Sequence, residues 1–334
     1  MTAKRISLFL AVFFVAGGAF AAPAGRESPS PMSFFFEPVI QKGFGGVAYD
    51  LSYPESNGVW TDLSRLEFPE LSLEAGGIIG MTINQDGHRE WLIEVGATHS
   101  TAPMSGNMND YDWFQEYNYP KVPWSYTYSN DSTVSWQAFA DAAWTFASGP
   151  SWLVALYGMY RYQDMSHEED TVTGWQYDWS TYPTPGITAG FYDTTNDVLE
   201  YSLTSHTLGL GFLGELEVLP GFSVQLRACY TPVYVSDRDD HKLRTKLSTA
   251  SGFGNGLYTD LKITYRLAPI NGLSTFLTLD GSFTYYVVDT TQKQYWYGNA
   301  DASNGNQQGK TNTGVGHVIT STQFNVGLSL GFLL

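Results

Sequence analysis

The sequence predicts an all-β fold, a ten-stranded antiparallel transmembrane β-barrel that extends above an outer membrane. Three observations predict it: an apolar N-terminal segment of signal-peptide length, a composition rich in aromatic residues and glycine but poor in charge, and repeated segments in which apolar and polar residues alternate. The first indicates the compartment, the second the surroundings of the protein surface, and the third the secondary structure.

The first 21 residues have the three parts of a secretory signal peptide. Lys4 and Arg5 give a positive start, an apolar run follows, and Ala19 and Ala21 frame a small-x-small cleavage site. The run is shorter than the roughly 20 apolar residues of a membrane-spanning helix. We therefore expect two parts, a signal peptide over 1–21 and one barrel domain over 22–334.

The composition favours a barrel over a soluble secreted protein. Aromatic residues make up 16% of the chain and glycine occurs 34 times, while charged residues account for only 15%. An ordinary soluble domain carries roughly 25% charged residues. Cys229 is the only cysteine, so an intrachain disulfide and a zinc–thiolate site are excluded.

The net charge of the chain is −16, which argues against nucleic acid and anionic lipid surfaces as main partners. It favours cationic peptide or protein substrates. The solubility of long surface loops explains the same charge equally well.

In ten segments apolar and polar residues alternate with a period of two, and Gly, Pro, Asn or Asp bound each segment. They lie near 35–53, 63–84, 90–102, 132–148, 151–166, 199–218, 221–237, 256–268, 273–291 and 316–334. Several exceed the roughly 9–11 residues that cross the hydrocarbon, so we expect the barrel to stand above the membrane. The long polar links, which we expect to be extracellular loops, are 103–131, 167–198, 238–255 and 292–315.

Two acidic clusters stand next to these predicted loops. Asp110 and Asp112 form the first, and residues i and i+2 on a strand share one face. By the same rule Asp237, Asp239 and His241 share a face in the second. If the clusters meet in the lumen, at least one carboxyl pKa should rise, and an Asp beside a His can help the imidazole to activate water. Solvated strand ends or a Ca²⁺ site are the alternative interpretation.

The remaining histidines show no comparable acidic partner at strand spacing. We interpret them as loop or girdle residues: His88, His99, His167, His206 and His317.

At the two clusters the sequence resembles the omptin family of outer-membrane proteases. Residues 106–113 read Gly-Asn-Met-x-Asp-x-Asp-Trp, and residues 236–241 read Ser-Asp-x-Asp-x-His. The signal segment, the ten strands, the chain length and the order of the clusters extend the resemblance over most of the chain. It implies an aspartic-type endopeptidase with its active site facing the cell exterior.

The resemblance implies four catalytic residues. Asp239 and His241 would form the pair that activates the nucleophilic water. Asp110 and Asp112 would be the opposing couple, with Asp110 holding that water against His241.

The resemblance also implies a substrate pocket for Arg or Lys. Asp237 would receive the basic side chain, together with a second acid from the first strand, for which Asp50 is the candidate. Two carboxylates would select a basic side chain by charge-assisted pairing.

Members of the omptin family need lipopolysaccharide, which they bind through basic residues on the outer wall. The corresponding stretch here, residues 160–170, is acidic, so another outer-leaflet lipid is an open alternative as activator. We expect no cofactor, no metal and a monomer.

A non-enzymatic outer-membrane barrel, either an adhesin or a small pore, is the main alternative to the endopeptidase. The long aromatic loops and the missing lipid-binding arginine favour it. A soluble β-protein is a more distant alternative.

Overall fold

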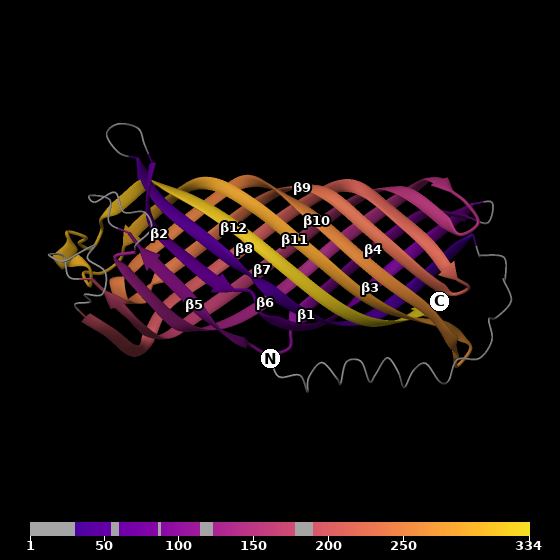
Figure 1. Ribbon diagram of the computed structural model, residues 1–334, viewed down its shortest axis with the longest axis horizontal. Helices are drawn as coiled ribbons and strands as arrows, with labels where there is room; N and C mark the ends of the chain where they lie inside the picture. Colours follow the sequence, from indigo (N-terminus) through magenta and orange to yellow (C-terminus); the bar gives the residue numbers. More distant parts are fainter. Residues whose placement is uncertain (1–30, 55–59, 86–87, 114–122, 178–189) are drawn as a thin grey trace.

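The computed structural model describes residues 31–54, 60–85, 88–113, 123–177 and 190–334, which form an elongated closed β-sheet (Figure 1). The predicted signal peptide lies outside the described residues. The strands are β1 (Met32–Pro54), β2 (Trp60–Pro69), β3 (Ser72–Gln85), β4 (His88–Ser100), β5 (Met104–Asp112), β6 (Ser125–Ser148), β7 (Trp152–Gln176), β8 (Gly190–Leu219), β9 (Phe222–His241), β10 (Lys246–Ile270), β11 (Leu273–Trp296) and β12 (Thr311–Leu333). Two single-turn 3₁₀ helices are η2 (Lys242–Arg244) and η3 (Ala302–Asn304).

No helix among the described residues is long and apolar enough to cross a membrane.

Every pairing is antiparallel, and β12 pairs with β1, so that the sheet closes on itself. β2 and β3 lie in line along β1, and β4 and β5 lie in line along β6, so that any cross-section of the described barrel contains ten strands. Pro69 and Pro103 stand at the two interruptions, where a missing N–H donor ends a ladder. The all-β fold and the ten-stranded ring predicted from the sequence are confirmed.

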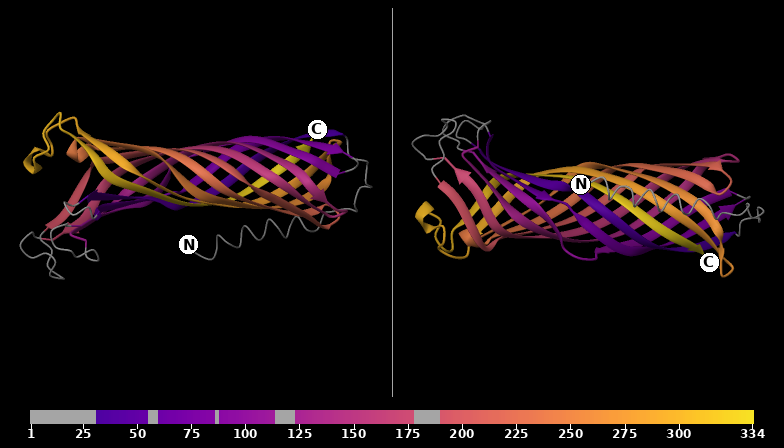
Figure 2. Two further views of the ribbon diagram at one scale, coloured as in Figure 1. Left: turned by 90° about the horizontal axis from the view of Figure 1, so that it is seen from above. Right: turned by 60° about the horizontal axis from the view of Figure 1, so that its bottom comes forward.

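The predicted long loops are wrong in their extent, because the strands continue into them. β5 and the start of β6 occupy much of 103–131, β7 continues to Gln176, and only residues 242–245 separate β9 from β10. In these extensions both faces of the strands carry polar residues, so the apolar alternation that identifies a strand in a sequence is lost. Figure 2 shows the resulting long tube from two further directions.

The outer surface differs between the two ends of the tube. Toward the C-terminal end, apolar side chains face outward on every side, among them Phe34, Ile40, Ile79, Val95, Leu156, Leu208, Leu210, Phe212, Leu226, Leu257, Leu261 and Val326. Toward the opposite end, many of the exposed positions are polar or charged, among them Glu168, Asp170, Glu200, Arg238 and Lys293.

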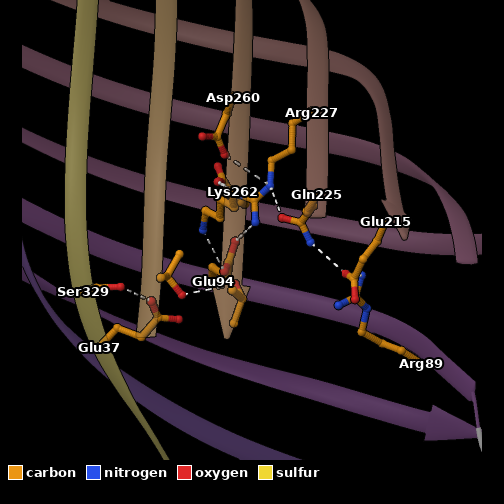
Figure 3. A network of polar contacts seen from close by, with 12 residues as sticks. Glu37, Arg89, Glu94, Glu215, Gln225, Arg227, Asp260, Lys262 and Ser329 are labelled. Atoms are coloured by element: carbon orange, nitrogen blue, oxygen red, sulfur yellow. Dashed lines mark hydrogen bonds and ion pairs between the residues drawn. The ribbon is translucent and has the colours of Figure 1, made fainter. Parts of the chain in front are cut away.

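A polar network crosses the interior at the level of the apolar belt (Figure 3). Arg227 is 1% exposed and forms ion pairs with Glu94 at 2.5 Å and Asp141 at 3.0 Å. Lys262 reaches Glu94 at 3.4 Å. The cavity lined by this network measures only about 70 Å³.

An apolar and aromatic layer lies between this network and the polar end of the tube. Its buried members include Val47, Tyr49, Leu66, Phe68, Met108, Tyr201, Leu203, Val235, Val288 and Ile319. Tyr201 stacks on Phe68 with ring centroids 4.3 Å apart, so this layer forms a packed floor beneath the open end.

Candidate active site

A cleft opens at the end of the tube that is remote from the C-terminus. It consists of two adjoining hollows of about 430 Å³ and about 520 Å³. Seven residues line both hollows: Asp110, Asp112, Trp124, His241, Arg244, Asp301 and Asn306. The two acidic clusters of the sequence therefore contribute to one space.

Asp110 and Asp112 enter the cleft from β5. Met108, two residues earlier on the same face, is anchored in the apolar floor, and this fixes the phase of the strand. Ser64 donates a hydrogen bond to Asp110 at 3.3 Å, and Ser125 donates one to Asp112 at 3.1 Å. Burial, followed by repulsion from Asp112, raises the pKa of Asp110 to about 8. This aspartate couple therefore retains one proton at neutral pH.

Asp239 and His241 come from β9, with His241 Nε2 3.6 Å from Asp239 Oδ2. The same Oδ2 accepts a 2.5 Å hydrogen bond from the hydroxyl of Tyr49, whereas Oδ1 is buried without a hydrogen-bond partner among the described residues. Burial raises the pKa of Asp239 to about 6, although Lys246 and Tyr49 oppose the shift.

The pKa of His241 is held well below its ordinary value, first by burial and then by the positive charges of Lys246 and Arg244. The imidazole is therefore neutral at physiological pH and has a lone pair available to accept a proton. With Asp110 in the same cleft, a neutral base stands opposite a carboxyl group that still carries a proton.

Asp237 is inside the barrel but does not line the cleft. Its Oδ2 lies 2.7 Å from His317 Nε2 and accepts a 3.4 Å hydrogen bond from Tyr201, while its Oδ1 accepts one from the amide of Ala250 at 3.0 Å. The carboxylate is buried and already has three partners in the floor.

Asp50 is not brought to Asp237, contrary to the expectation from the resemblance. Tyr49 and Leu51 point inward on β1, so Asp50 points outward between them. It forms an ion pair at 3.2 Å with Arg65 of β2, on the outer wall. The two-residue period of β1 thus puts the Asp50 side chain on the face that points away from the lumen.

The interpretation of the other histidines is wrong for two of them. His167 and His317 are fully buried, and His167 Nδ1 lies 3.1 Å from Asp131 just as His317 lies against Asp237. Their partners come from neighbouring or distant strands, so spacing along one strand could not identify them. His206 does lie on the outer wall, against Tyr160.

Sequence reasoning also missed two residues at the site, Tyr49 and Lys246. Tyr49 could have been found from the phase of β1, because the alternation of Val47 and Leu51 places it on the inner face. Lys246 is directly opposite His241 in the β9–β10 ladder, but this region was predicted to be a loop.

Within the described part of the chain, no group of three or more His, Cys, Asp or Glu side chains could hold a metal ion.

No protein-family model and no curated protein sequence matches the chain. Among solved structures, it is similar to the outer membrane protease OmpT from Escherichia coli, with a TM-score of 0.74 and 14% identity over 92% of this chain and 99% of that one. The translocator domain of the autotransporter NalP from Neisseria meningitidis gives a TM-score of 0.31, with 11% identity over 98% of this chain and 95% of that one. A FadL homologue from Pseudomonas aeruginosa gives 0.30, with 6% identity over 90% of each chain. The chain thus shares the fold of OmpT over nearly its whole length.

Proposed function

We propose that the protein is an outer-membrane endopeptidase that hydrolyses peptide bonds with an activated water molecule. One observation carries the proposal: Asp110 and Asp112 share a single cleft with His241, and Asp239 lies directly behind that histidine. The fold shared with OmpT supports it, since that protein is an outer membrane protease.

In the proposed reaction, a water molecule binds between Asp110 and the neutral His241. His241 takes a proton from the water as its oxygen attacks the scissile carbonyl, and Asp239 stabilises the imidazolium that forms. The tetrahedral intermediate then collapses, the C–N bond breaks, and His241 returns the proton to the leaving amine. The Asp110–Asp112 couple keeps its shared proton and orients the water.

The outer surface supports a membrane location with the cleft facing the cell exterior. The apolar belt faces outward all around one part of the tube, as expected of a lipid-facing wall, while the cleft is at the polar end. The buried Arg227 network occupies the lumen at the level of the belt, which argues against the alternative of a pore.

The lipid activator and the monomeric state are also proposals. Arg161, the basic residue of the 160–170 stretch, turns into the lumen, where it donates a 2.8 Å hydrogen bond to Tyr258. An activating lipid would therefore bind elsewhere on the wall, or through polar groups other than this guanidinium. The net charge of −16 supports long-range attraction of cationic polypeptides.

The test is digestion of a peptide library by refolded protein in lipid vesicles, with cleavage sites mapped by mass spectrometry. Asp239→Asn and His241→Ala should each abolish cleavage, while the barrel still shows heat-modifiable migration in detergent gels. Asp289→Asn and His206→Ala make the same chemical changes on the outer wall and should cleave normally. Undiminished cleavage by both site variants would refute the assigned roles.

A further inference from the structure

The cleft carries more positive charge than a pocket for a basic side chain should. Besides its acids, it is lined by Arg244, Lys246 and Lys310. The two acids expected to receive Arg or Lys are elsewhere: Asp50 is on the outer wall and Asp237 is engaged by His317 in the floor. Neither of these two acids lines the cleft, and the carboxylates that do line it include the proposed catalytic couple, Asp110 and Asp112.

Lys246 is the most informative of these cations. Its residue is 7% exposed, and the β-ladders place it directly opposite His241 on one side and Trp296 on the other. Residues opposite each other in an antiparallel ladder share a face, so its side chain points into the barrel beside the histidine. Among the described residues, no side chain forms an ion pair or a hydrogen bond with its ammonium group.

An ammonium group that is largely buried and has no direct ion-pair partner is incompletely compensated, because burial removes much of the water around the charge. Burial lowers the pKa of Lys246, and the nearby carboxylates of Asp239, Asp110 and Asp112 oppose that shift. An anion that enters the cleft would supply the missing partner and restore direct pairing for the charge.

Lys310 extends the positive character of the cleft without a neutralising partner. Its ammonium donates hydrogen bonds to the carbonyl of Gly305 and to Asn306 at 2.7 Å, and it lies over the ring of Trp296. These partners are uncharged. Asp301, which also lines the cleft, accepts hydrogen bonds from Trp296 and Asn306.

We propose that the cleft binds an acidic side chain of the substrate, Asp or Glu, next to the scissile bond, with Lys246 as the specificity-determining residue. This inference rests on the proposed endopeptidase function. The negative charge of the whole chain acts at long range on the approach of a polypeptide, whereas the residue accepted beside the bond is set by the groups that it touches.

The test uses three peptides that are identical except for one central residue, which is Glu, Gln or Lys. The rate constant kcat/KM is measured for wild type in vesicles. A hydrogen bond to a charged group changes kcat/KM by roughly 10- to 100-fold. The Glu peptide should therefore be cleaved faster than the Gln peptide by about that factor. The Lys peptide should be cleaved more slowly than the Gln peptide.

Lys246→Met should remove the preference for Glu over Gln, and Lys246→Arg should keep it. Lys293→Met deletes the same charge from the outer wall and should leave all three rates as in wild type. The ratio of two rates cancels any uniform effect of the substitution on folding or on His241.

A preference of wild type for the Lys peptide would overturn the inference and leave the endopeptidase function standing. An equal loss of activity on all three peptides in Lys246→Met would also overturn it, because Lys246 would then act on the reaction and not on the side chain. Failure of wild type to cut any peptide in the library would instead refute the endopeptidase function itself.

Discussion

The hydrogen bond from Tyr49 to Asp239 predicts a shift in the pH dependence of cleavage. The bond measures 2.5 Å, both residues are buried, and it favours the ionised form of a carboxyl group whose pKa is already about 6. In Tyr49→Phe the aromatic ring and its packing remain, but the donor is lost. A hydrogen bond to a charged group is worth about 1.5–3 kcal/mol, which corresponds to about one to two pKa units.

The pKa of Asp239 in this variant should therefore rise to about 7 to 8, because a stabiliser of the charged form has been removed. Since the carboxylate supports protonation of His241, the acid limb of kcat/KM moves to higher pH. At pH 6 the variant should be about 5- to 50-fold slower than wild type, and by about pH 9 the two rates should converge.

The assay is the pH profile of kcat/KM on one library-derived peptide, with refolded protein in vesicles. Tyr285→Phe, on the outer wall, is the matched control and should keep the wild-type profile. An unchanged acid limb in Tyr49→Phe, with activity retained, would refute the reasoning. A uniform loss at every pH would show that the hydroxyl acts on structure and not on the ionisation of Asp239.

Asp110→Asn should abolish cleavage yet stabilise the barrel above about pH 5. The pKa of the Asp110 carboxyl in the folded protein, about 8, exceeds its ordinary value, so this carboxyl makes the wild type progressively less stable as pH rises from about 4 to 8. The temperature at which the folded species disappears from the gel should fall less between pH 5 and pH 8 in the variant than in wild type. Arg227→Met should lower the free energy of unfolding in urea by about 3–5 kcal/mol, because Glu94 and Asp141 lose their buried countercharge; a loss below 1 kcal/mol would contradict this role. Asp50→Ala should leave kcat/KM on every peptide within about twofold of wild type, since a single exposed ion pair on the outer wall contributes little.

The site could be predicted best from the sequence where both members of a residue pair lie on the same strand. Asp239 and His241 could be placed on one inner face from their spacing alone, as could Asp110 and Asp112. In the structure Asp110, Asp112 and His241 line the cleft, and Asp239 is buried next to His241. Asp50 lies outside the site because the same alternation buries Val47 and Leu51 on the inner face of β1 and turns Asp50 outward.

Contacts across strands could not be predicted in this way, because register is set by the packing of the whole ring. The His167–Asp131 pair joins β7 to β6, and the His317–Asp237 pair joins β12 to β9. The position of Lys246 beside His241 is set by the tight turn between β9 and β10, in which Thr245 takes a left-handed conformation with φ of 47°. Because polar residues lie on both faces of the strands there, the sequence does not indicate where this turn occurs.

The two strand interruptions near Pro69 and Pro103 have a consequence for local opening. Beyond them, β2 and β5 are joined by four residue pairs, from Ser64–Asp112 to Glu67–Asn109, whereas β9 and β10 are joined by twenty. The free energy needed to separate two strands locally grows with the number of bonds that must break together. Amide hydrogens of the β2–β5 seam should therefore exchange with solvent far sooner than those of the β9–β10 ladder. The aspartate couple is therefore on a strand whose seam opens locally more often, whereas the histidine is on a strand whose ladder opens rarely.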